Sequence, residues 1–304
     1  MKNTILYIAT VLIWGSTWLA IEFQLGEASV LTSVFYRFAI AAAVMWLYCL
    51  WAKVPLNFSV KNHGYIALLA LFNFSMNYVL IYSSQKYLTS AMTSIAFSTM
   101  LLMNIVNTRL FFGSQISARV YLGALLGIFG LVALFWNDLA TNDENSLLGL
   151  ALVLASALVA SLGNMASVRN SRAGMNVLAV NAWGMLYGAL ALALIVIATG
   201  TGFDASWTPA YTGSLLYLAI FGTVIAFATY YVLLNEMGPE KASYSIVLFP
   251  MVAVVLSSLF EDFVWSANTF IGFALVLLGN VVILTPVAKI RQRIAAFKTA
   301  RIAA

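Results

Sequence analysis

The chain has 304 residues, of which 63% are hydrophobic and only 8% are charged, and its formal net charge is +5 at pH 7. Soluble globular proteins contain about 25% charged residues, so this composition cannot cover a water-facing surface and predicts an integral membrane protein. One histidine and one cysteine exclude an intrachain disulfide and argue against a His/Cys metal site, so no metal or other cofactor is expected. The basic residues are scattered over loops and a tail, which indicates membrane topology rather than a nucleic-acid partner.

Ten apolar stretches follow one another along the chain, each about as long as the ~20 residues that a helix needs to cross the hydrocarbon core. The first exceeds the apolar region of a secretory signal and lacks a small-residue cleavage site, so we interpret it as a span. The predicted fold is an all-α integral membrane protein with ten transmembrane helices. Their expected positions are 4–22, 30–51, 64–82, 89–110, 119–136, 146–167, 175–199, 213–236, 243–260 and 268–287.

Basic residues sort to one side of the membrane when the N-terminus is placed inside and the spans alternate. Of the 15 Lys and Arg residues, only Lys86 then falls outside and only Arg37 lies within a span. Because Lys and Arg concentrate in cytoplasmic loops, we expect both termini to be cytoplasmic. The protein is then a multi-pass protein of the inner membrane.

The two halves of the sequence repeat each other. Residues 82–136 align without a gap with residues 231–285, which lie 149 positions later. Each repeat would hold five spans, an odd number, so the two copies must cross the membrane in opposite directions. This predicts two inverted five-helix repeats, residues 1–140 and 141–304. Inverted repeats are typical of secondary transporters, whose substrate site lies near the midplane between the halves.

Several short motifs occur in the order and spacing of one known family. They are Trp14–Thr17, Tyr36–Phe38, Gly222–Ala226 with Tyr230 and Tyr231, Gly238–Ser243, Pro250 and Glu261. Together they resemble the drug/metabolite transporter superfamily, EamA type, over essentially the whole chain. The resemblance implies five-plus-five inverted repeats. It also implies a central cavity bounded by spans 1, 3, 4, 6, 8 and 9, with spans 5 and 10 at the periphery.

The resemblance also implies a function. Members of this superfamily that have a similar length resemble exporters of metabolites. Within the superfamily, this sequence most resembles the branch of the aromatic amino-acid exporters. We therefore expect a secondary transporter that exports small metabolites, foremost amino acids with aromatic or other apolar side chains. The alternatives are a drug, cation or nucleoside-type exporter of the same fold, and a channel. Two departures bear on the substrate: Leu101 stands opposite Pro250 where the family has a proline, and residues 157–161 lack a tryptophan often found there.

Aromatic side chains at the depth of the bilayer mark the predicted substrate pathway. Tryptophans well inside their spans do not act as interfacial anchors, and hydroxyls at helical spacing would be costly facing lipid. A cavity lined in this way suits a small amphipathic solute with an aromatic or apolar side chain. The alternative is plain helix packing with interhelical hydrogen bonds. The predicted pathway residues are Trp14, Trp18, Tyr78, Tyr82, Trp183, Tyr230 and Tyr244.

Arg37 is the only charge placed deep within a span, ~12 Å from its outer end. A lone buried cation is costly, so we expect it to pair with an acid such as Glu22 or Glu27, or to meet a backbone carbonyl. Contact with a substrate carboxylate is the alternative. Further positions expected to serve structure or gating are Pro250 and four glycines that permit close helix packing inside the bundle of a monomer: Gly123, Gly130, Gly272 and Gly279.

Other functional classes lack the residues that they need. No Gly-x-Ser-x-Gly motif and no pair of intramembrane carboxylates occur, so the protein is not expected to be an enzyme. No loop resembles the filter of a channel. Because every acid and the histidine map to loops or span ends, we expect transport down the solute's own gradient, with at most weak proton coupling. The alternative is that Glu22 or Glu236, near span ends, titrates in the cavity.

Overall fold

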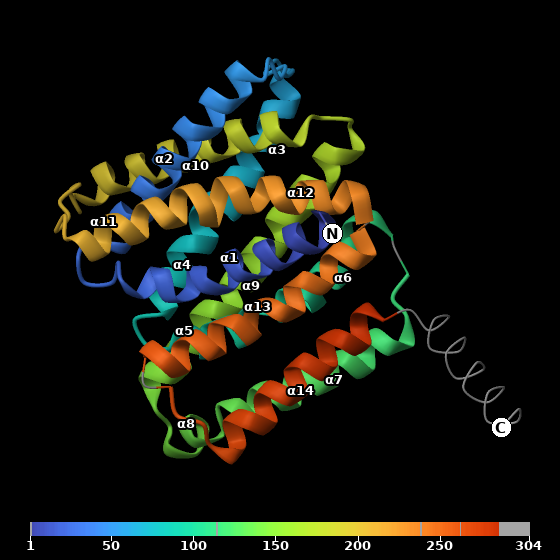
Figure 1. The fold of residues 1–304 in the computed structure, drawn as a ribbon. Coiled ribbons are helices and arrows are strands. Elements are labelled where there is room, and N and C mark those ends of the chain that lie inside the picture. The colour runs from blue at the N-terminus through green and yellow to red at the C-terminus, as the bar shows by residue number, and fades with distance from the viewer. Residues whose placement is uncertain (1, 114, 238, 262, 286–304) are drawn as a thin grey trace, which may run out of the picture.

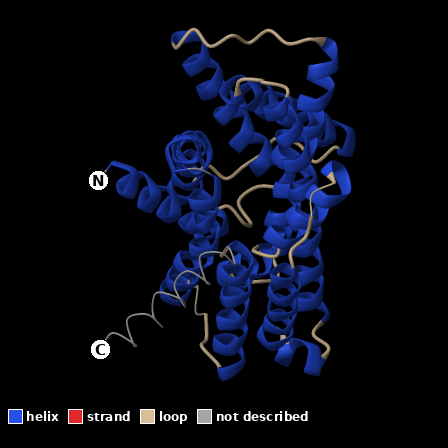
Figure 2. Cartoon of the chain, turned by 90° about the vertical axis from the view of Figure 1, so that its right-hand side faces the viewer, coloured by secondary structure: helices blue, strands red, loops and turns tan. Residues whose placement is uncertain are grey.

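The computed structural model describes residues 2–113, 115–237, 239–261 and 263–285, and at residues 2, 231, 234–237, 239–244 and 246 only the backbone. Within these ranges every regular element is a helix (Figure 1, Figure 2). Eight helical runs are long and apolar enough to cross a membrane, and two further apolar helices, Ala118–Leu134 and Val247–Phe260, are shorter. The predicted all-helical membrane class is therefore confirmed.

Helical structure falls on each of the ten apolar stretches. The first half comprises α1 (Lys2–Glu22), α2 (Val30–Trp51), α3 (Val60–Leu71), η1 (Phe72–Met76), α4 (Asn77–Ser84), α5 (Ser90–Phe97), α6 (Met100–Phe112) and α7 (Ala118–Leu134). After the short α8 (Trp136–Thr141), the second half comprises α9 (Glu144–Arg172), α10 (Val177–Thr199), α11 (Pro209–Leu216), η2 (Tyr217–Ile225), α12 (Ala226–Met237), α13 (Pro239–Phe260) and α14 (Ala267–Leu284).

Several helices begin where a polar side chain caps the first turn. A side-chain oxygen at the cap accepts a hydrogen bond from a backbone N–H that the helix itself leaves unpaired. At the start of α14 the bonding is reciprocal, because Ser266 and Thr269 each accept from the other's backbone N–H. The capping residues are Ser29 for α2, Ser59 for α3, Thr89 for α5, Asp143 for α9, Asn176 for α10, Thr208 for α11 and Ser266 for α14.

Two π-helical segments interrupt the helical runs at related positions of the two halves. The last five residues of η2, 221–225, lie 149 positions after the five residues of η1, 72–76, which is the offset that aligns the halves. In each segment a hydroxyl donates to the carbonyl five residues earlier: Ser75 to Ala70 at 3.3 Å and Thr223 to Leu218 at 2.8 Å. Such π-helical turns occur often at functional sites.

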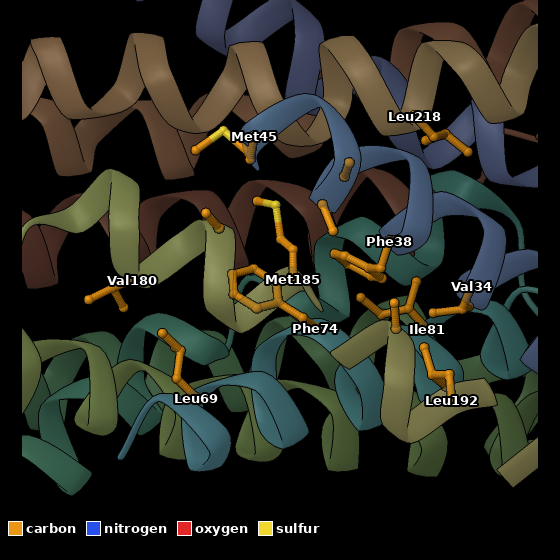
Figure 3. Close-up of a cluster of buried hydrophobic side chains, with 14 of the residues drawn as sticks. Val34, Phe38, Met45, Leu69, Phe74, Ile81, Val180, Met185, Leu192 and Leu218 are labelled. Carbon is orange, nitrogen blue, oxygen red and sulfur yellow. The ribbon is translucent and has the colours of Figure 1, made fainter. Parts of the chain in front are cut away.

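The largest cluster of buried apolar side chains lies where α2, α10 and the run from α3 to α4 meet. Figure 3 shows Phe38 of α2, Phe74 of η1 and Met185 of α10 close together at its centre. The ring centres of Phe38 and Phe74 are 5.5 Å apart. Dispersion contacts of this kind are a main source of stability between helices in a bilayer, where lipid tails are as apolar as leucine.

The glycine pairs bring α7 and α14 into close contact at one edge of the bundle (Figure 1). An added Cβ at Gly123 would lie 2.6 Å from the carbonyl oxygen of Gly279, and one at Gly130 would lie 2.8 Å from that of Gly272. No larger residue fits there without moving a backbone. The two repeats thus contact each other through the four glycines, inside the molecule.

Candidate functional site

A cavity of about 480 Å³ lies between side chains of the two halves. It is lined from α1, η1, α4, α5, α6, α9, α12 and α13, and α2 contributes Arg37. These are the spans that the family resemblance implied, with α2 in addition, and none of the described residues of α7 or α14 lines the cavity. The volume falls in the range of ~300–1,000 Å³ that is usual for small-molecule sites.

One wall of the cavity is aromatic. The ring of Trp14 in α1 lies 5.4 Å from that of Phe227, 5.2 Å from that of Tyr230 and 5.2 Å from that of Phe249, measured between centres. The indole Nε1 of Trp14 donates to the backbone oxygen of Gly222 in η2 at 3.2 Å. A helix of the first half is therefore held against three segments of the second half by one side chain.

The wall contributed by η1, α6 and α9 is built from amides. Asn73 Nδ2 donates to Asn164 Oδ1 at 3.1 Å, and Asn164 Nδ2 donates to Asn104 Oδ1 at 3.1 Å. Asn73 lies directly against Gly163 of α9, where an added Cβ would collide with its Oδ1. The amides leave this wall polar but uncharged. Asn104 and Asn164 were not among the predicted pathway residues, although an asparagine inside an apolar span is itself a signal of a buried polar contact.

Arg37 supplies the charge of the cavity. Its side chain is 1% exposed, its Nε donates to Thr223 Oγ1 at 3.3 Å, and its guanidinium carbon lies 4.4 Å from the centre of the Tyr78 ring. Among the described side chains, no carboxylate lies within ion-pair distance of Arg37. The expected pairing with Glu22 or Glu27 is therefore not found, because the arginine extends toward η2 whereas Glu22 lines a different hollow.

That second hollow, of about 450 Å³, lies one helical turn further along α1 and α4. Its lining includes Glu22, Gln24 and Lys86. Beside it, Gln85 Nε2 donates to the backbone oxygen of Trp18 and to Ser90 Oγ, both at 3.0 Å, and Ser90 Oγ donates to Glu261 at 2.6 Å. This chain of hydrogen bonds joins the end of α1 to the end of α13, and so links the two halves at this end of the bundle.

Comparison with known proteins assigns the chain to a family. The model of the EamA-like transporter family matches it twice, over residues 1–136 and 147–285. The chain belongs to the EamA-like transporter family. The family inferred from the motifs is thereby confirmed, and EamA-like proteins are transporters rather than enzymes.

Named relatives of this EamA-like chain are transporters. "Uncharacterized transporter YoaV" of Bacillus subtilis (strain 168) is 25% identical, covering 90% of this chain and 93% of the relative. "Uncharacterized inner membrane transporter YedA" of Escherichia coli (strain K12) is 26% identical, covering 88% of each chain. "Probable amino-acid metabolite efflux pump" of the same organism is 23% identical, covering 91% of this chain and 93% of the relative. A crystal structure of another protein shares the fold, with a TM-score of 0.65 at 20% identity over 93% of this chain and 96% of that one.

Four of the seven predicted pathway residues of this EamA-like protein line the larger cavity. They are Trp14, Trp18, Tyr78 and Tyr230, and Arg37 and Pro250 line it as well. The side chain of Tyr244 lies outside the described residues.

Tyr82 and Trp183 are not among the residues that line the larger cavity. Tyr82 is fully buried, donates to Gln24 Oε1 at 2.8 Å and lines the second hollow. Trp183 of α10 donates to the backbone oxygen of Leu56 at 2.9 Å and packs against Trp46, with ring centres 4.7 Å apart. Here α10 turns this face toward α2 and the loop that follows α2.

Proposed function

We propose that this EamA-like transporter exports amino acids with aromatic or other apolar side chains across the inner membrane. The observation that carries the proposal is the contact of Trp14 with Phe227, Tyr230 and Phe249, which gives a cavity between the two halves an aromatic wall. Aromatic faces bind apolar and aromatic side chains, and the amide wall offers hydrogen bonds to a polar head group. The name of the relative from Escherichia coli, a probable amino-acid metabolite efflux pump, points the same way.

The proposal includes the membrane arrangement. Ten spans form two inverted repeats, residues 1–140 and 141–304, with both termini cytoplasmic, and the protein works as a monomer. The two matches of the family model, the helices on all ten apolar stretches and the sorting of basic residues support this arrangement. Transport occurs by alternating access, in which the two repeats exchange their packing around the cavity.

The proposed transport is not driven by protons. No Asp, Glu or His is found among the described residues that line the larger cavity. His63 bonds to Tyr187 at 2.9 Å and contacts Trp183, away from that cavity, and Glu22 lines the second hollow. The side chain of Glu236 is outside the described residues. Without a titratable group at the binding site, solute binding is not linked to protonation there, and the proposed transport runs down the solute's own gradient.

Counterflow in proteoliposomes tests the function. Vesicles that contain the purified protein are loaded with unlabelled L-phenylalanine, L-leucine, uridine or ethidium, and the entry of the same solute in labelled form is followed. We expect saturable exchange of the two amino acids and none of uridine or ethidium. Exchange of uridine or ethidium without that of amino acids would favour the alternative exporters, and single-channel currents would favour a pore.

A further inference from the structure

The guanidinium of Arg37 is incompletely paired. Its Nη1 is buried and has no hydrogen-bond partner among the described residues, and the hydrogen bond from its Nε to Thr223 is long at 3.3 Å. A buried charge without a counter-charge is among the costliest arrangements in a protein interior or a bilayer. Buried donors of native proteins almost always have partners, so an unpaired one requires an explanation.

Neighbouring side chains hold the guanidinium in place without neutralising it. The ring of Tyr78 lies beneath it and attracts the cation through its π face. The hydroxyl of Thr223 donates its proton to the backbone oxygen of Leu218 inside η2. It can therefore only accept a hydrogen bond from Arg37. Next to Thr223, an added Cβ at Gly222 would lie 2.7 Å from Thr17 Cγ2 and 3.7 Å from Arg37 Nη2, so the lack of a side chain there lets α1 and the guanidinium both approach η2.

Arg37 is the one charged side chain among the described residues that line the cavity. The other described lining residues are aromatic, aliphatic, hydroxyl, amide or thioether side chains, so Arg37 gives the cavity a net positive charge. In such surroundings a cationic solute is repelled and an anionic group is attracted. A guanidinium offers parallel N–H donors that match the two oxygens of a carboxylate.

We propose that Arg37 binds the carboxylate of the transported solute, so that the site selects molecules with a carboxylate next to an apolar or aromatic body. This inference rests on the proposed function, because it takes the larger cavity as the transport site. Since Arg37 is 1% exposed, binding turns the guanidinium from the Tyr78 ring toward the cavity. The ammonium group of an amino acid then lies among neutral amides and ring faces, which tolerate it but do not require it. Amines without a carboxylate are excluded.

A series of phenyl compounds tests the ligand side on the unmodified protein. L-phenylalanine, 3-phenylpropionate and 2-phenylethylamine share the same ring and differ in their charged groups. Their apparent dissociation constants are measured from the thermal stabilisation of the detergent-purified protein. We expect L-phenylalanine and 3-phenylpropionate to bind and 2-phenylethylamine to bind at least about tenfold more weakly. Equal or tighter binding of the amine, or binding by none of the three, would overturn the proposal.

Variants test the residue. Arg37→Gln should reduce the affinity for 3-phenylpropionate about tenfold or more and remove the discrimination against 2-phenylethylamine, whereas Arg37→Lys should keep part of both. Tyr36→Phe is the matched control, because it removes a hydrogen bond of the preceding residue to Phe203 without touching the cavity, and its affinities should not change. If Arg37→Gln folds and still discriminates, the proposal is wrong. If it does not fold, the ligand series on the unmodified protein decides.

The binding assay separates this inference from the proposed function. Carboxylate-selective binding that depends on Arg37, without counterflow of amino acids, would contradict the proposed export but support the carboxylate site. Counterflow of amino acids that is inhibited equally by 2-phenylethylamine and 3-phenylpropionate would support export and reject the role of Arg37.

Discussion

The two π-helical segments hold related positions in the two halves but have different surroundings. At η1, Phe74 is buried against Gly184 and Gly188 of α10, and Ser75 donates to the backbone oxygen of Gly188 at 3.2 Å. At η2, the corresponding contact is with a charged side chain of α2, because Thr223 accepts from Arg37. At Phe74 and Ser75, η1 is therefore packed against the glycines of α10, whereas η2 meets Arg37, a side chain that lines the cavity.

This difference shows how an inverted repeat can acquire a polar site. The repeat places a π-helical turn in each half, but the residue that faces it decides what the turn does. Gly188 of the second half allows α10 to pack closely against η1 of the first half, which favours rigidity. Arg37 of the first half brings an incompletely paired cation to η2 of the second half, which favours binding. We therefore expect substitutions near η1 to change stability and substitutions near η2 and Trp14 to change transport.

The largest expected effect is on the η1 side. Phe74→Ala should lower the free energy of unfolding by about 3–5 kcal/mol, because it leaves a cavity in the core cluster. The matched change at η2, Thr223→Ala, removes one hydrogen-bond acceptor and should lower the free energy of unfolding by about 1–3 kcal/mol. Thermal and denaturant unfolding in detergent micelles measure both. Equal destabilisation by the two variants would contradict the comparison.

The glycine that faces η1 gives the next largest effect. In Gly188→Ala the new Cβ would lie 2.9 Å from the backbone oxygen of Phe74, so the helices must separate. Overpacking of this kind should lower the free energy of unfolding by about 1–3 kcal/mol. Gly213→Ala in α11 is the control, because nothing lies within 4 Å of its added Cβ. A neutral Gly188→Ala would show that η1 is not tightly packed.

On the other side of the comparison, Trp14 should matter for transport. Trp14→Ala should reduce counterflow of L-phenylalanine about tenfold, equivalent to ~1.4 kcal/mol, because the aromatic wall loses its central ring. Trp183→Ala, which removes a tryptophan of the same size outside the cavity, should leave counterflow nearly unchanged in protein of matched amount. Similar losses in both variants would mean that packing, not the cavity, explains the effect of Trp14.

The smallest expected effect on transport comes from Glu22, which lines the second hollow. Vesicles with equal L-phenylalanine on both sides should show no sustained accumulation after a pH step, and Glu22→Gln should change counterflow by less than about twofold. The reason is that Glu22 lines the second hollow and not the larger cavity. Accumulation after the pH step that is lost in Glu22→Gln would identify this carboxyl as the carrier of a proton.

Helix positions and family could be predicted from the sequence because their signals are local. Runs of about 20 apolar residues in a chain with 8% charge leave no other fold than membrane helices. The caps at Ser29 and Ser266, the motifs around Trp14 and Tyr36, and the paired glycines are equally local. The depth of Trp14, Trp18, Tyr78 and Tyr230 in their spans followed from counting residues.

Only the tertiary structure decided which side chains contact each other between neighbouring helices. A helix of a soluble protein reveals its buried face through an amphipathic stripe. In a bilayer the lipid-facing and protein-facing sides of a helix are both apolar. The order of apolar residues therefore does not show which face of the helix packs against its neighbours. For this reason the sequence did not show that Trp183 faces α2 and the loop after it, or that Tyr82 lines the second hollow. For the same reason only the packed bundle revealed that Arg37 meets Tyr78 and Thr223 instead of an acid.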